Sequence, residues 1–392
     1  MIYLDNVATT PIDPEVLDSM LPYLKEEFGN PSSRHYTLAK NAENAINLAR
    51  EQVANLINAQ PEEIIFTSCA SESNNFIIKG VSDYLKNYKH KGNHIITSCV
   101  EHKSVLNSCK FLNGDIFFNK DKKRMGKTIA QPKIDRGYTV DFLNVNEKGQ
   151  VSLIDFNKAI LPNTILASIM WGNNELGTLN DINSISNIAK SKNILFHSDA
   201  TQVLGKINID VKSTPVDFLS FSAHKLYGPK GIGATFIRKN IIMPEITCLI
   251  HGGSQENGYR AGTHSVHNIV GFGKACEIAK KDMNEYISKI ESLTKEVTNI
   301  LKEKFNDIIF INDCDDSIPG VISVLIPEII NERYIANLSE KIAISSGSAC
   351  SIGEPSYVID AIGKSDMTSK FLRISLNKFL NKNDLLKLKE EL

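Results

Sequence analysis

The sequence lacks the features that would direct the chain to a membrane or out of the cell. No apolar run in its 392 residues is long enough to span a bilayer. The N-terminus carries no basic and then apolar leader of the kind that directs export. The formal net charge is −1, so no overall field attracts nucleic acid or an anionic membrane surface. We therefore expect a cytoplasmic protein that binds neither nucleic acid nor membrane directly.

The seven cysteines show neither a metal-site pattern nor a disulfide framework. None lies in a CxxC pair, and no histidines fall at the spacing of zinc ligands, so we expect no metal site. An odd count without an export signal indicates free thiols, most of them small buried apolar residues. Cys350 differs, because its run of small residues, SSGSACSIGEPS, suits a loop on which a thiolate can form.

Strands and helices alternate along the chain from about residue 60 to 240. This pattern predicts a mostly parallel sheet covered by helices, and hence the α/β class. A chain of 392 residues is long enough for two domains, and its 42% hydrophobic and 23% charged residues are typical of a globular protein. From Lys274 onward a long amphipathic helix and further short strands predict a smaller α+β unit.

Two polar residues follow two apolar strands in this alternation. Lys225 lies in DFLSFSAHKLYGPKG, after a strand over 217–222, and Asp199 follows a short strand over 194–196. Parallel sheets bind ligands at the carboxyl ends of their strands. An amine that holds an aldehyde and a carboxylate that keeps a pyridine nitrogen protonated are the two groups that pyridoxal phosphate requires. Taken alone, Lys225 would more often be an ordinary surface lysine.

Four motifs carry a resemblance to a known family. YLDNVATTP, HSDATQ, SAHKLYGPKG and SSGSAC follow one another in this chain. Together they resemble the cysteine desulfurases, NifS/IscS-like members of the class V aminotransferase superfamily, from Tyr3 to Leu376. The resemblance implies an aspartate-aminotransferase-like fold (fold type I of pyridoxal-phosphate enzymes). It implies a large cofactor-binding domain over 14–265 with a seven-stranded sheet, a small domain over 1–13 and 266–392, and a homodimer.

The resemblance also implies the residues that bind pyridoxal 5′-phosphate. Lys225 would hold its aldehyde, Asp199 would pair with the ring nitrogen, and His102 would stack on the ring and help to move protons. Further positions would contact the ring hydroxyl (Gln202), the phosphate (Ser71, Ser222, His224 and, from the partner subunit, Thr263) and other parts of the cofactor (Ala70, Asn174). The small residues around Ser71 also open a helix. The free backbone amides at its start could hold a phosphate, or these residues could simply be an ordinary helix cap.

The implied reaction removes sulfur from L-cysteine. Arg373, with Asn174, would hold the substrate carboxylate, since a guanidinium grips a carboxylate in bidentate fashion. Lys225 would move the Cα proton, and the Cys350 thiolate would take the sulfur as a persulfide, leaving alanine. A selenocysteine lyase, an aminotransferase and a sulfur-relay subunit without activity of its own are the alternatives. The loop thiol argues against the aminotransferase, and Lys225, Asp199 and His102 argue against the relay subunit.

The sequence leaves the sulfur acceptor open. An acceptor protein could serve iron–sulfur cluster assembly, tRNA thiolation or DNA phosphorothioation. The chain ends soon after RISL, without the long tail of the iron–sulfur-assembly members, which weakens a role in general cluster assembly and leaves specialised acceptors open. A charged stretch over 113–138 is expected to be a surface insertion and a possible partner site.

Overall fold

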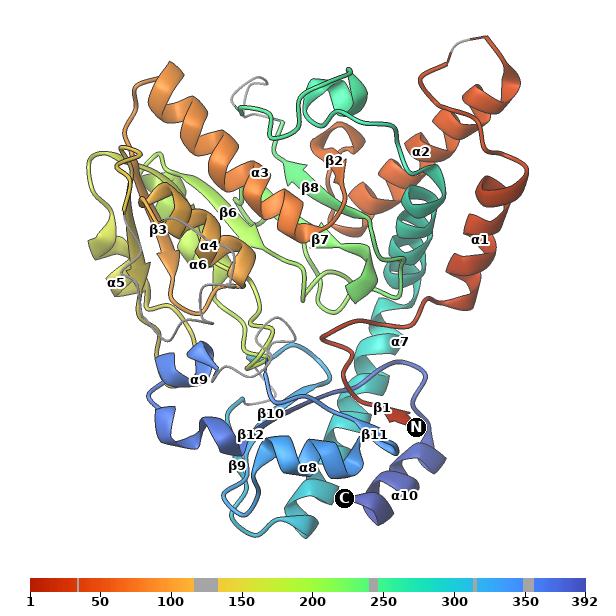
Figure 1. Ribbon diagram of the computed structural model, residues 1–392, viewed down its shortest axis with the longest axis vertical. Coiled ribbons are helices and arrows are strands. Elements are labelled where there is room, and N and C mark those ends of the chain that lie inside the picture. The colour runs from red at the N-terminus through yellow and green to blue at the C-terminus, as the bar shows by residue number, and fades with distance from the viewer. Residues whose placement is uncertain (34, 116–132, 240–245, 313–315, 348–355) are drawn as a thin grey trace, which may run out of the picture.

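The computed structural model describes residues 1–33, 35–115, 133–239, 246–312, 316–347 and 356–392. A larger α/β body and a smaller α+β body lie one above the other in Figure 1. The longest helix, α7 (Val266–Lys304), passes from the upper body into the lower one. The N- and C-termini both lie in the lower body.

The larger body is built on a seven-stranded sheet with the order β2-β8-β7-β6-β5-β3-β4. Only β8 runs antiparallel to its neighbours, β2 and β7. The strands are β2 (Ile64–Thr67), β3 (His94–Ser98), β4 (Thr139–Leu143), β5 (Thr164–Ser168), β6 (Leu195–Asp199), β7 (Phe218–Ser222) and β8 (Gly233–Ile237). Every residue of β3, β5, β7 and β8 is buried, as expected where helices cover both faces of a sheet. The predicted α/β class and the mostly parallel seven-stranded sheet are confirmed.

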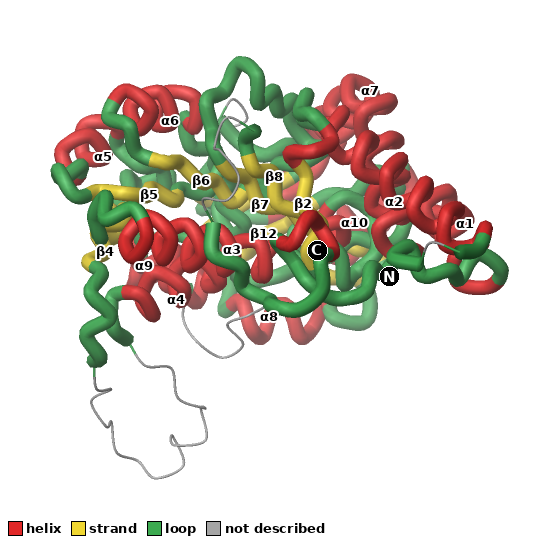
Figure 2. Tube along the Cα trace, turned by 90° about the horizontal axis from the view of Figure 1, so that it is seen from above, coloured by secondary structure: helices red, strands yellow, loops and turns green. Residues whose placement is uncertain are grey.

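Helices lie on both faces of this sheet (Figure 2). On one face are α3 (Ala70–Asp83) and α4 (Lys103–Leu112), and on the other are α5 (Leu153–Ala159) and α6 (Ile182–Ser191). Two further helices, α1 (Pro14–Lys25) and α2 (Thr37–Leu56), pack against α7. The α1 helix begins at an Asp13 cap, whose side chain accepts from the Glu15 amide, with proline at the first helical position.

The smaller body has its own core. In its sheet β10 (Val321–Leu325) lies between β9 (Ile309–Phe310) and β12 (Phe371–Ser375), and β1 (Ile2–Tyr3) pairs separately with β11 (Ile342–Ala343). Three short helices complete it, α8 (Asn331–Leu338), α9 (Tyr357–Ala361) and α10 (Lys382–Glu391). The first turns of α7 belong to the large core and its last turns to the small one. Because α7 contributes to both cores, the predicted domain boundary at residue 266 stays a prediction.

The cysteines of the described residues are less buried than the sequence predicts. Cys109 and Cys276 are buried, whereas Cys69, Cys99 and Cys248 are partly exposed, and all five are free thiols. In the same part of the chain no helix is long and apolar enough to cross a membrane. No cluster of three or more histidine, cysteine, aspartate or glutamate side chains that could hold a metal ion occurs there either.

Gly233 is a position where the sheet tolerates no side chain. A Cβ built on it would lie 2.4 Å from the Phe221 carbonyl oxygen and 2.8 Å from the backbone of Cys69. Gly233→Ala must therefore separate β7 from the start of α3. We expect it to lower the free energy of unfolding by about 2 kcal/mol, measured by urea denaturation. An unchanged midpoint and slope would contradict this packing.

Candidate functional site

A cavity of about 260 Å³ lies at the carboxyl ends of the parallel strands. Of the predicted site residues that the structure describes, all except Thr263 line it. Its wall is formed by Val7, Ala8, Cys69, Ala70, Ser71, His102, Met170, Gly172, Asn174, Asp199, Thr201, Gln202, Ser222, His224, Lys225 and Arg373. These residues come from both bodies of the molecule, so the cavity is closed only when the two bodies are packed together.

Lys225 enters the cavity from a single 3-10 turn (Ala223–Lys225) that follows β7 directly. Its Nζ donates to the carbonyl oxygens of Val7 and Ala8, at 2.6 and 2.5 Å. These carbonyls belong to the N-terminal segment, which reaches the cavity from β1 and is fixed by a hydrogen bond from the Val7 amide to Ser375 Oγ. These two hydrogen bonds hold the Lys225 amine in one orientation inside the cavity, so Lys225 is not a solvated surface lysine.

Asp199, the last residue of β6, is buried in the cavity wall. Its Oδ2 accepts from Asn74 Nδ2 at 2.7 Å, and its Oδ1 accepts from the Thr201 amide at 3.0 Å. These two hydrogen bonds fix the orientation of the Asp199 carboxyl group in the cavity wall. Asn74 was not predicted, and its place on α3, one turn after Ala70, is the only sequence signal that could have indicated it.

A second carboxyl, Glu101, lies buried close to Asp199. Burial raises the pKa of Glu101 to about 8, although hydrogen bonds from the Met170 amide and Ser98 oppose the rise; the nearby Asp199 charge adds to it. Glu101 is therefore neutral at pH 7, which avoids two adjacent buried negative charges. This burial could not be predicted from the sequence, because Glu101 precedes His102 at a junction between a strand and a helix, where side chains are often exposed.

His102 is fixed by its position as the cap of α4. Its Nδ1 accepts from the Ser104 amide at 3.2 Å and lies 2.7 Å from Ser104 Oγ. This assignment leaves Nε2 as the ring nitrogen that carries a hydrogen in the neutral form. The same Ser104 hydroxyl accepts from Asn74 Nδ2 at 2.8 Å, so Asn74 joins the cap of His102 to the carboxylate of Asp199.

The opposite end of the cavity offers donors for an anion. Ala70 and Ser71 open α3, a 14-residue helix whose first amides receive no capping hydrogen bond from the Cys69 side chain and are available to an anion. The Ser222 hydroxyl is buried and has no hydrogen-bond partner among the described residues. Burial, together with the charges of Lys225, Lys230 and Lys206, lowers the pKa of His224 to about 4, so its ring is neutral at pH 7.

Arg373 lies in β12 with only 1% of its surface exposed. Its Nη1 donates to the Asn174 carbonyl and its Nη2 to Asp5 Oδ1, both at 2.8 Å. Its Nε is buried without a partner among the residues that the structure describes. Two hydrogen bonds thus hold the guanidinium in the cavity wall. A guanidinium fixed in this way is a suitable group for binding a small carboxylate.

Two predicted residues remain, Cys350 and Thr263. Cys350 falls within 348–355, outside the described residues. On its flanks, Ser356 Oγ donates to Glu175 Oε2 at 2.5 Å, and a Cβ on Gly347 would lie 3.3 Å from the same oxygen. Both flanks therefore meet at Glu175, the neighbour of Asn174 in the chain. Thr263 is exposed on the surface and does not line the cavity of its own chain.

The segment that carries Thr263 is fixed by a buried carboxylate. Glu256 accepts from both Arg50 Nη atoms at 2.7 Å, from the Phe66 amide at 2.7 Å and lies 2.7 Å from His264 Nε2. Burial acts to raise the pKa of Glu256, but the hydrogen bonds from Arg50 and His264, the Arg50 charge and the Phe66 amide lower it to about 2.

Comparisons with known proteins agree with this geometry. The model of the aminotransferase class-V family matches residues 2–119 and 126–388. The cysteine desulfurase IscS of Buchnera aphidicola subsp. Baizongia pistaciae is 41% identical over 389 residues, which cover 98% of this chain and 90% of the relative. A solved NifS-like protein is 35% identical with a TM-score of 0.86, over 99% of this chain and 97% of its own. A structure of SspA in complex with cysteine is 36% identical with a TM-score of 0.77, over 96% of this chain and 99% of its own.

The ion pair of Glu256 predicts an acid-dependent loss of stability. Because the pKa of Glu256 is about 2 in the folded protein and its ordinary value is 4.5, this group stabilises the fold above about pH 4.5, and the contribution is lost as the pH falls toward 2. We expect Glu256→Gln to remove about 3 kcal/mol at pH 7 and to flatten the fall of stability between pH 5 and 3. Glu62→Gln, at an exposed glutamate, is the matched control in urea denaturation. Parallel curves for Glu256→Gln and wild type would contradict the assigned ion pair.

Proposed function

Because this chain belongs to the aminotransferase class-V family and, within it, to the cysteine desulfurases, we propose that it converts L-cysteine to L-alanine with pyridoxal 5′-phosphate bound in the cavity described above. The sulfur forms a persulfide on Cys350 and passes to an acceptor protein. The observation that carries the proposal is the convergence of the Lys225 amine, the Asp199 carboxylate and the Arg373 guanidinium in one cavity.

The residues of the cavity fit the cofactor. Asp199 is oriented by hydrogen bonds from Asn74 and the Thr201 amide and would pair with the ring nitrogen. The Ser222 hydroxyl, which lacks a partner among the described residues, lies where the N-terminus of α3 would meet a phosphate, and Ser71 and His224 complete that end. His102 would lie against the ring, with Gln202 toward its hydroxyl and Ala70 and Asn174 beside it. When bound, the cofactor supplies an electron sink for a carbanion at the substrate's α-carbon.

The chain's own residues bind the substrate and move its proton. Arg373, fixed by Asp5 and the Asn174 carbonyl, lines the cavity and would hold the carboxylate of L-cysteine. The Lys225 amine, which would hold the cofactor aldehyde in the resting enzyme, would also act as the base that takes the proton from the α-carbon of the substrate. The Val7 and Ala8 carbonyls accept hydrogen bonds from this amine in the structure and would orient it.

The sulfur step needs only one further group. The Cys350 thiolate attacks the sulfur of the substrate and forms an S–S bond, while the C–S bond breaks and its electron pair stays with the carbon. That carbon takes up a proton, so that L-cysteine and the enzyme thiol become L-alanine and the enzyme persulfide. The flanks of the Cys350 segment, Gly347 and Ser356, both lie at Glu175, next to the cavity residue Asn174.

We also propose that the enzyme is a homodimer in the cytoplasm. Thr263 is exposed, and its segment is fixed by the Glu256 ion pairs, which supports a role in the partner subunit's phosphate site. Twofold dimers are the commonest oligomers of soluble proteins. The acceptor would be a protein of iron–sulfur cluster assembly, tRNA thiolation or DNA phosphorothioation.

Replacement of Lys225 tests the cofactor site. We expect Lys225→Ala to lose the visible absorbance of the cofactor-bound amine and to lower alanine formation at least about 10³-fold, because both attachment and proton transfer need the amine. Lys230→Ala, at an exposed lysine on the same loop, serves as the control and should keep both signals. Retained absorbance in Lys225→Ala would show that another residue holds the cofactor.

Replacement of Cys350 tests the sulfur step. We expect the wild type to form alanine and, with a reductant, sulfide in equal amounts from L-cysteine. Cys350→Ala should form little of either while its cofactor absorbance is unchanged, and Cys248→Ala, at a partly exposed cysteine, should match the wild type. Equal rates from Cys350→Ala and wild type would mean that Cys350 does not accept the sulfur, as in a selenocysteine lyase. No alanine from any variant would favour a sulfur-relay subunit.

A further inference from the structure

Lys206 is a buried lysine that the proposed reaction does not use. It lies four residues after Gln202, in the turn that follows β6, with 3% of its surface exposed. Its Nζ donates to Gln202 Oε1 at 3.3 Å. Burial, and then the positive charges of Lys225 and Arg373, lower the pKa of Lys206 to about 7. A buried amine among other cations is costly, so its presence calls for a compensating partner.

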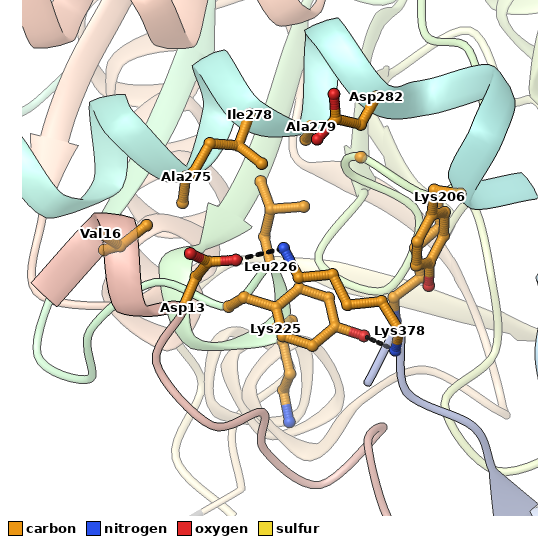
Figure 3. Close-up of a pocket in the computed structure, with 13 residues that line it drawn as sticks. Asp13, Val16, Lys206, Lys225, Leu226, Ala275, Ile278, Ala279, Asp282 and Lys378 are labelled. Atoms are coloured by element: carbon orange, nitrogen blue, oxygen red, sulfur yellow. Dashed lines mark hydrogen bonds and ion pairs between the residues drawn. The ribbon is translucent and has the colours of Figure 1, made fainter. Parts of the chain in front are cut away.

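The protein itself supplies no such partner among the described residues. Lys206 lines a small cavity behind Lys225, shown in Figure 3, together with Asp13, Lys378 and residues of α7. Asp13 forms an ion pair with Lys378 and is therefore engaged. Asp282 on α7 lines the same cavity but forms no ion pair with Lys206, and Tyr227 and Tyr286 are the other titratable groups there. The charge of Lys206 is thus compensated from outside the chain or not at all.

The contact with Gln202 shows which way that glutamine amide faces. Lys206 donates to Oε1, while Nε2 donates to the Val7 carbonyl at 3.2 Å, and Gln202 lines the large cavity. A flipped amide would place its NH₂ group against the lysine amine and would lose both hydrogen bonds. The amide nitrogen carries two hydrogens and Val7 accepts one of them. The other is left for an acceptor in the cavity.

We propose that Lys206 is a positioning residue that acts on the cofactor through Gln202. Its amine fixes the Gln202 amide so that the amide nitrogen donates to the ring oxygen of pyridoxal phosphate. The negative charges of that cofactor offset the charge of Lys206. The proposal rests on the proposed function, since it needs pyridoxal phosphate in the large cavity. It assigns to Lys206 an action through Gln202 and no contact with the substrate.

A double-mutant cycle on cofactor affinity tests this assignment. The cofactor is first removed from the protein, which is then titrated with pyridoxal 5′-phosphate. The dissociation constant is measured by absorbance for wild type, Lys206→Met, Gln202→Ala and the double variant. We expect Lys206→Met to weaken binding about tenfold when Gln202 is present, because the loss of one oriented hydrogen bond is worth about that factor. In the Gln202→Ala background the same change should weaken binding less than about twofold. Lys192→Met, at an exposed lysine, should leave the dissociation constant unchanged.

The outcomes separate this proposal from the proposed function. An equal loss of affinity in both backgrounds would show a merely structural role for Lys206 and would overturn the proposal, as would no loss in either background. If wild type binds no cofactor, both the proposal and the proposed function fail. Methionine keeps the volume of the side chain and removes its charge, so we expect the cofactor-free Lys206→Met protein to melt no lower than wild type. If that variant does not fold, Lys206→Gln is used in the same cycle.

Discussion

The parallel pairing of β6 with β7 is the constraint on which the site depends. It aligns Asp199 with Ser220, so the carboxylate and the turn that bears Lys225 leave the sheet at the same edge. A slip of one residue would turn each side chain to the opposite face of the sheet and separate the two groups. Burial on both faces prevents such a slip, because every residue of β7 is buried. The chemistry of the site is therefore set by the register of a core strand pair.

Around this edge the fold gathers more positive than negative groups. Lys225, Lys206 and Arg373 approach one another, whereas the neighbouring Glu101 has a pKa raised by burial to about 8. This imbalance is costly in an empty protein and is relieved by an anionic ligand. A phosphorylated cofactor and a substrate carboxylate carry the charges that such a cavity needs. The arrangement thus suits an anionic ligand in the large cavity and gives a reason for the burial of a second lysine behind the first.

The sequence predicts the sheet and the main polar residues of this site better than the residues that hold them in place. Alternating strands and helices predict the sheet, and a polar residue after an apolar strand identifies Asp199 and Lys225, since both signals are local. Asn74 and Glu101 could not be identified, because their roles arise from contacts between α3, β6 and the loop before α4. From the sequence alone, Lys206 would be an ordinary lysine in a turn. Only its position beside α7 in the folded protein shows that it is buried. The thiols show the same limit, because local apolar context does not tell buried Cys109 from partly exposed Cys99.

The most direct test of the account is to locate the amine that holds the cofactor. Borohydride reduction of the purified enzyme attaches the cofactor permanently to that amine, and mass spectrometry of the digested protein then identifies the residue. The account predicts a single modification at Lys225, with Lys206 unmodified although it lies close by. A modification at Lys206, or at any lysine outside the cavity, would contradict the assignment of the site.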